Sequence, residues 1–288
     1  MKIKSQVEKL PKSTFKLTIT ISWEEVKQAY ADTLEKVAKT VKLAGFRQGK
    51  VPQKTVEEKI GKTAIYQEML PDLLSQAYRQ AVQEHQLKPI VSPQIKPLKT
   101  EEKKDWQFAA VTCEKPTVAL GNYQAQIKQE LKAGKIWVPG QAEKEEKRDE
   151  QQLAQEKLAK IFQVLTKTAK LELPALLVES EVSRSLAQLL DEIKKLGLSL
   201  ESYLASVKKT ASQLRQEQTA AAVSNLQLEL ILNEVADDLK VTVSDQDLEA
   251  LIQKSAQTEA EKKNLAAQKY YLASVLRRQK TIDKLMDL

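Results

Sequence analysis

The residues best suited to binding chemistry lie together in the segment Gly45-Phe-Arg-Gln-Gly-Lys-Val-Pro52. Glycines followed by a lysine are typical of a phosphate-binding P-loop. A P-loop, however, has four residues between its glycines and a Ser or Thr after its lysine. This segment has three residues between its glycines, and Val51 follows Lys50. The pattern therefore argues against a nucleotide site.

A contact loop is a better interpretation of the same segment. Two glycines permit a sharp turn and Pro52 can begin a helix, so that Phe46, Arg47 and Lys50 would project between two helices. Aromatic and arginine side chains carry much of the energy of interfaces, and lysine reaches phosphate or carboxylate groups. The residues alone leave open an ordinary turn in which Phe46 is tucked back onto its domain.

Few residues could catalyse a reaction or bind a metal. His85 is the only histidine and Cys113 the only cysteine, which excludes two-histidine and multi-cysteine metal sites. We interpret His85 as a residue at a helix end and Cys113 as a small buried side chain on a strand. Acidic residues occur mostly in runs beside lysines, as at 143–150, which is typical of a solvated helix face. We expect no catalytic residue, no metal and no cofactor.

The elements around the loop predict an α+β domain over residues 1–116. Ser22 and Glu25 have the spacing of a helix capping box, and Pro71 must kink its helix or begin a new one. The expected elements, in chain order, are a strand at 14–22, a helix at 22–44, a short helix ending at 61, a helical stripe at 65–82 and strands at 90–97 and 106–114.

A connector at 117–142 should lead to a helical domain at 143–288. The connector contains prolines and glycines among short extended pieces such as Ala125 to Leu131. Two helices should be long, at about 210–239 and 259–285, and thirty-residue helices span about 45 Å, so they could reach outward as arms. A closed bundle is the alternative. Capping boxes are predicted for Thr210 with Gln213, Ser244 with Asp247, and Thr258 with Glu261.

Charge separates the two parts of the chain. Residues 1–116 hold 21 Lys and Arg against 14 Asp and Glu, a net charge of +7, whereas residues 117–288 hold 25 of each. A basic module joined to a neutral one indicates that the first meets a polyanion, although a basic surface kept for solubility is an alternative. No stretch approaches the roughly 20 apolar residues of a membrane span. With one cysteine and no signal peptide, a cytosolic location is expected.

At the loop the chain resembles trigger factor, a family of ribosome-associated bacterial chaperones with the signature Gly-Phe-Arg-x-Gly-Lys-x-Pro. The residues that match the signature are Gly45, Phe46, Arg47, Gly49, Lys50 and Pro52. The similarity also covers the leading strand and helix and the segments 66–93, 106–123, 170–178, 197–204 and 240–248. The resemblance therefore spans nearly the whole chain.

The resemblance implies an α+β ribosome-binding domain followed by an extended all-α domain with helical arms. It implies that the helical domain holds nascent polypeptides and assists folding and export without ATP and without a membrane. The ribosomal contacts, to protein and RNA near the exit tunnel of the large subunit, would be made by Gly45, Phe46, Arg47, Gly49 and Lys50. A weak homodimer away from the ribosome stays open.

One departure from the family lies between connector and arms, where members usually carry a prolyl isomerase domain of the FK506-binding type. Here about 20 residues separate Tyr123 from the first helix of the C-terminal part, fewer than the roughly 40 with which a domain can fold unaided. We therefore expect no isomerase activity. The rival hypotheses are a basic RNA-binding protein, which would want aromatic residues among Lys and Arg, an exported periplasm-type chaperone, and a chaperone that retains isomerase activity.

Overall fold

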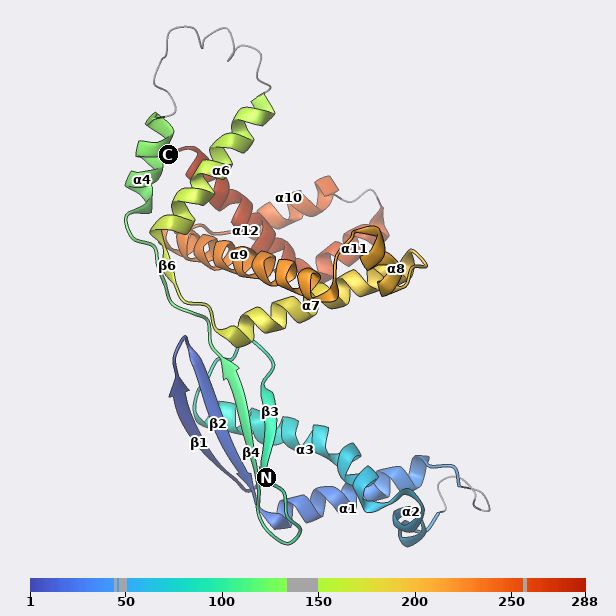
Figure 1. Ribbon diagram of the computed structural model, residues 1–288. Helices are drawn as coiled ribbons and strands as arrows, with labels where there is room; N and C mark the ends of the chain where they lie inside the picture. The colour runs from blue at the N-terminus through green and yellow to red at the C-terminus, as the bar shows by residue number, and fades with distance from the viewer. Residues whose placement is uncertain (44–45, 47–50, 134–149, 256–257) are drawn as a thin grey trace. The chain divides into compact units, whose positions relative to one another are not determined.

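The computed structural model describes the chain apart from residues 44–45, 47–50, 134–149 and 256–257 (Figure 1). The described residues form two compact units, Met1–Lys115 and Pro116–Leu288. The first combines a sheet with helices and the second is mostly helical. This confirms the fold class expected from the sequence. No helix in the described ranges is long and apolar enough to cross a membrane.

The first unit is built on a four-stranded antiparallel sheet in the order β1-β2-β4-β3. Its strands are β1 (Ile3–Leu10), β2 (Thr14–Ile21), β3 (Gln94–Lys99) and β4 (Trp106–Cys113). Successive side chains of a strand point to opposite faces, and Leu17 and Ile19 of β2 face the core beside Ala110 and Phe108 of β4. Helices α1 (Trp23–Thr40) and α3 (Lys62–Glu84) cover this apolar face.

Helix α3 is continuous through Pro71, so no new helix begins there. Pro71 is exposed, while Ile65, Met69, Leu73 and Ala77 are buried along one stripe. The proline thus lies away from the packed face, and burial of that face holds the helix together.

The start of α1 differs from the capping box expected for Ser22 and Glu25. Ser22 precedes the helix, but its hydroxyl is buried and has no hydrogen-bond partner among the described residues. Glu25 instead accepts a bond of 2.7 Å from the Lys2 N–H, and the Trp23 N–H donates to Asp105 Oδ1 at 3.0 Å. The difference arises because the chain before β1, a strand that the sequence did not predict, competes for the glutamate. Strand β3 also begins at Gln94, four residues later than expected.

The second unit joins a two-stranded sheet to a set of helices. Strands β5 (Val118–Ala119) and β6 (Lys170–Leu171) pair antiparallel. The helices are α4 (Tyr123–Ala133), α6 (Glu150–Thr168), α7 (Ala175–Lys195), α8 (Leu200–Ser206), α9 (Ala211–Asp238), α10 (Asp245–Ser255), α11 (Glu259–Ala267) and α12 (Lys269–Met286). Helix α4 packs on α6, and α7 on α9 (Figure 1). The expected start of the helical part, Glu143, lies outside the described residues.

The prediction of an extended piece at 125–131 is wrong, because these residues belong to helix α4. Tyr123 and Ile127 are both buried, and they lie one helical turn apart. Their stripe packs against α6, whose Ile161 and Leu165 are also buried. The prolines and glycines of the surrounding connector suggested extended pieces, but the spacing of Tyr123 and Ile127 and their packing partner favour a helix.

The three predicted capping boxes in the helical part are confirmed. Thr210 with Gln213 and Thr258 with Glu261 exchange both bonds, and so do Ser244 and Asp247. The first long helix is present as α9, but the second is divided at Gln268, which has φ −99° and ψ 23°. No described residue of α11 is buried, whereas α12 buries Thr281 and Leu285. Packing therefore does not hold α11 in line with α12.

Candidate functional site

The predicted contact loop lies between α1 and α2 (Gln53–Ile60). Four of the residues predicted for the site, Gly45, Arg47, Gly49 and Lys50, lie outside the described residues. The structure describes Phe46, Val51 and Pro52, and Pro52 is the extended residue that immediately precedes α2. Both flanking helices were predicted from the sequence, but α1 ends at Thr40, before the expected end near residue 44, because Val41 is extended.

A separate apolar cluster forms the base of this loop. Val51, near the end of the loop, is buried together with Leu34 and Ala38 of α1, Val56 of α2 and Ile65 of α3. Leu43, just before the loop, packs against the same cluster. Both ends of the segment are therefore anchored to three helices, which would hold a projecting loop in place.

Phe46 lies between these two anchors but is itself exposed. Its side chain is 44 % exposed, and it is not among the apolar residues that pack against the cluster. Its N–H donates to the Leu43 carbonyl oxygen at 3.1 Å. A phenylalanine exposed on an anchored turn is available for contact with a partner.

The second unit keeps several large apolar side chains in solvent. Tyr270 is 95 % exposed, Tyr271 65 % and Leu196 74 %. Leu153, Leu190, Leu198 and Val275 are also exposed. An open hollow of about 590 Å³ runs along one face of α9, where Thr219, Ala220 and Val223 contribute small side chains. Exposed apolar groups beside small polar ones suit weak binding of varied apolar segments.

Cys113 and His85 could in principle serve as a nucleophile and a base, but neither lies in surroundings that suit that role. Cys113 is fully buried, and burial raises the pKa of its thiol, so the reactive thiolate is disfavoured. His85 is the C-cap of α3, and its Nε2 lies 2.9 Å from Ser5 Oγ. Ser5 donates its one hydroxyl proton to Glu84 Oε2 at 2.7 Å, so it accepts from His85 and does not donate to it. A nucleophilic serine would need the opposite direction.

No group of three or more His, Cys, Asp or Glu side chains within the described ranges could hold a metal ion.

The sequence indicated the loop through its residue types and spacing. It did not point to the anchors, because Val51 and Leu43 look like ordinary apolar residues until the cluster is seen.

Two family models together match almost the whole chain. The model described as bacterial trigger factor protein matches residues 3–136, and the model of the trigger factor C-terminus matches residues 141–287. Trigger factors of Staphylococcus aureus strains JH9 and Newman are each 37% identical over 108 residues. This match covers 38% of the chain and 25% of each relative, so it spans a quarter of the relatives' length.

A solved structure gives a match over the full length of the chain. It is described as "Promiscuous Substrate Recognition in Folding and Assembly Activities of the Trigger Factor Chaperone". The TM-score is 0.66, the sequence identity 12%, and the match covers 99% of both chains. At this identity the likeness concerns the fold.

Proposed function

Since the chain belongs to the trigger factor family, as the matches over residues 3–136 and 141–287 show, we propose that it is an ATP-independent chaperone of the ribosome. It docks on the large subunit near the exit tunnel through Gly45, Phe46, Arg47, Gly49 and Lys50. Its helical unit holds nascent polypeptides in the cytosol and protects them from aggregation.

The observation that carries the docking proposal is the exposure of Phe46 between the partly buried Leu43 and the buried Val51. An exposed aromatic side chain that does not pack on the cluster of Leu43 and Val51 is suited to a partner and contributes little to the core. The net charge of +7 on residues 1–116 supports a partner rich in phosphate. Ribosomal RNA, together with ribosomal protein, meets that requirement.

The holding function rests on the exposed apolar groups of the second unit. Tyr270, Tyr271 and Leu196 lie in solvent, and residues 117–288 carry equal numbers of positive and negative side chains. A neutral surface with separate apolar contacts would bind many unfolded segments without selecting for their charge.

The proposal includes no prolyl isomerase activity. Only residues 137–140 lie between the two matched regions, and α4 occupies Tyr123–Ala133 just before them. An inserted domain of the isomerase type needs many more residues than this interval has. The protein therefore acts by binding and not by catalysis.

Co-sedimentation with large ribosomal subunits tests the docking. A variant with Phe46→Ala, Arg47→Ala and Lys50→Ala should bind at least about 30-fold more weakly, since a central aromatic or arginine contact carries about 2 kcal/mol or more. The matched control removes one apolar and two cationic side chains from β3, with Leu98→Ala, Lys96→Ala and Lys99→Ala, and should pellet like the parent. Undiminished pelleting of the loop variant would refute the docking assignment.

A further inference from the structure

A small pocket of about 210 Å³ lies beside the helices that carry the contact loop. One face of α1 supplies Trp23, Lys27 and Tyr30, which are spaced as neighbours on a helix surface. The first turns of α3 supply Lys62 and Tyr66. The pocket is smaller than the roughly 300 Å³ of sites for drug-sized molecules, so it suits a single ring system.

The wall of the pocket is aromatic and preformed. The ring centroids of Tyr30 and Tyr66 are 4.9 Å apart, and those of Tyr66 and the buried Trp106 are 5.3 Å apart. The ring centroids of Trp23 and Trp106 are 6.4 Å apart. Neighbouring rings are tilted by 49–52° and not stacked face to face. Rings held in this way can stack against a planar ligand with little loss of side-chain freedom.

The rim of the pocket has an excess of positive charge. Lys62 lies 3.5 Å from Glu102, so these two charges compensate each other. Lys27 and Lys103 are exposed, and neither has an ion-pair partner within the part of the chain that the structure describes. With Glu57 included, the lining carries three lysines against two carboxylates, a net charge of +1, which favours an anionic ligand over the side chain of a basic peptide.

Two carboxylates line the pocket, and Glu57, which is not the one paired with Lys62, can select the ligand. Glu57 Oε1 accepts from the Tyr30 hydroxyl at 2.8 Å, which orients the carboxylate. A carboxylate offers about four acceptor positions, so Glu57 can still accept N–H groups from a ligand. Guanine presents two adjacent N–H groups on its Watson–Crick edge and matches a carboxylate better than the other bases do.

We propose that this pocket binds one unpaired nucleotide of an RNA chain, with guanine preferred. The base stacks on Trp23 and Tyr66, Glu57 accepts its N–H groups, and the flanking phosphates lie against Lys27 and Lys103. Stacking on aromatic rings combined with lysine contacts to phosphate is a common way of binding single-stranded RNA. The inference deepens the proposed function, and rests on it for the source of the RNA, which is the ribosome.

The test uses the full chain and labelled RNA hexamers, without ribosomes. Uridine hexamers with one central guanosine or adenosine are titrated by fluorescence anisotropy over a range of salt concentrations, with guanosine monophosphate as competitor. The hexamer with guanosine should bind more tightly than the one with adenosine. It should also bind more tightly than the mononucleotide, which lacks one flanking phosphate. Equal affinity for the mononucleotide would overturn the assignment to RNA.

Variants assign the binding to the pocket. Lys27→Gln with Lys103→Gln should reduce the slope of log affinity against log salt by about 1.4, since each phosphate contact contributes about 0.7 for single strands. Trp23→Leu should weaken binding at least about fivefold through lost stacking. Glu57→Gln should remove the preference for guanosine and leave the salt slope unchanged. Circular dichroism verifies that each variant is folded.

The matched control is Lys96→Gln with Lys99→Gln, which makes the same charge change on β3, at residues that do not line the pocket. If this control reduces the salt slope as much as the pocket variant does, the binding is non-specific and the proposal is wrong. Binding of an arginine-rich peptide without binding of any hexamer would also overturn it. Ribosome docking through Phe46 would survive either result, because its test measures pelleting and not affinity for free RNA.

Discussion

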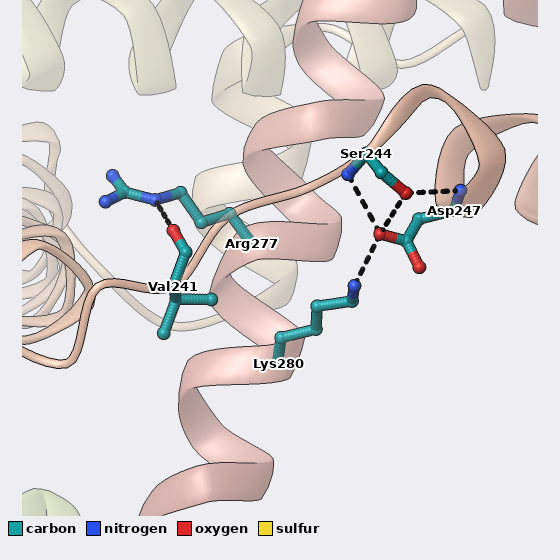
Figure 2. A network of polar contacts seen from close by, with 5 residues as sticks. All are labelled: Val241, Ser244, Asp247, Arg277 and Lys280. Atoms are coloured by element: carbon teal, nitrogen blue, oxygen red, sulfur yellow. Dashed lines mark hydrogen bonds and ion pairs between the residues drawn. The ribbon is translucent and has the colours of Figure 1, made fainter.

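Lys280 of α12 places its Nζ 2.6 Å from Asp247 Oδ2, the same oxygen that accepts the Ser244 N–H at 2.9 Å (Figure 2). Asp247 thus closes the capping box at the start of α10 and also ties α10 to α12. One turn earlier on α12, Arg277 Nε donates to the Val241 carbonyl oxygen at 2.9 Å. Two cationic side chains of α12 thus bind neighbouring parts of the chain: Arg277 binds the link between α9 and α10, and Lys280 binds the first turn of α10.

Asp247→Asn should lower the melting temperature of the second unit at pH 7. The bond from Lys280 and those from Ser244 lower the pKa of Asp247 from 3.8 to about 2. Because the folded-state pKa is depressed, the stabilisation is present above about pH 4 and is lost as pH falls toward 2. Thermal unfolding by circular dichroism should show a parent–variant difference that shrinks over this window. Glu249→Gln on the same helix is the control, and a difference that persists unchanged at pH 2 would contradict the role of the charge.

Tyr123→Phe tests whether α4 belongs to the second unit. The buried Tyr123 hydroxyl donates to Asp238 Oδ2 at 2.6 Å, which joins α4 to the end of α9. Its loss should cost about 1–2 kcal/mol of unfolding free energy, measured by urea titration, since hydrogen bonds to charged groups are among the stronger ones.

The same residue predicts a response to high pH. Burial, and then the bond to Asp238, raise the pKa of Tyr123 from 10.0 to about 12. A raised pKa contributes stability that is complete below pH 10 and is lost as pH rises toward 12. The phenylalanine variant should lack this particular loss, and equal pH sensitivity of the two proteins above pH 10 would refute the assignment.

Phe46→Ala and Val56→Ala should separate binding from stability. Phe46 is substantially exposed, so its truncation should change the unfolding free energy by less than about 0.5 kcal/mol. Val56 is fully buried in the cluster below the loop, and its truncation should cost about 2 kcal/mol. Denaturant unfolding measures both. A large loss for Phe46→Ala would show that the ring packs onto the domain.

Prolyl isomerisation of a short peptide should proceed at the same rate with and without the protein. The four residues 137–140 between the matched regions cannot enclose a proline ring. Uncatalysed exchange takes tens to hundreds of seconds, so even modest acceleration is easily observed. Acceleration in proportion to protein concentration would overturn the exclusion of isomerase activity.

Local signals in the sequence were the most reliable. The capping boxes at Thr210, Ser244 and Thr258 depend on residues three positions apart, and all three form. The box at Ser22 fails because Lys2, distant in sequence, takes the glutamate. Competition alone does not decide the outcome, since Asp247 also accepts from the distant Lys280 and still closes its box. At Ser22 the serine hydroxyl is buried as well, and it makes no bond to the helix start.

Where a sequence pattern was compatible with two kinds of secondary structure, tertiary packing decided which one formed. Residues 125–131 were predicted to be extended because their connector contains prolines and glycines, but they form a helix that buries Tyr123 and Ile127 against α6. The charged and apolar residues of β1 likewise form a strand because they pair with β2, where Val7 lies opposite Leu17. Neither partner could be assigned from the local sequence.

The two candidate sites differ in how far the sequence revealed them. The contact loop is a prediction from the types and spacing of eight consecutive residues, and the structure describes three of them, Phe46, Val51 and Pro52. The nucleotide pocket combines Trp23, Tyr66 and Lys103, which are far apart in the chain. Trp23, Lys27 and Tyr30 do share one helix face, but such a stripe normally indicates core packing. Only the fold brings the lysines and the rings together.

The holding function predicts that exposed tyrosines of the second unit contribute to client binding. Tyr270→Ser with Tyr271→Ser should reduce the ability of the full chain to suppress aggregation of a denatured client, measured by light scattering without nucleotide or ribosomes. Both side chains are mostly in solvent, so their loss should leave the melting temperature nearly unchanged. Leu98→Ser is the control, because Leu98 is also exposed, at 51 %, but belongs to the first unit. If the helices form a closed bundle whose surface does not bind clients, the tyrosine variant will suppress scattering no worse than the parent. A selective loss in that variant, with the control unaffected, would locate client contacts on the second unit.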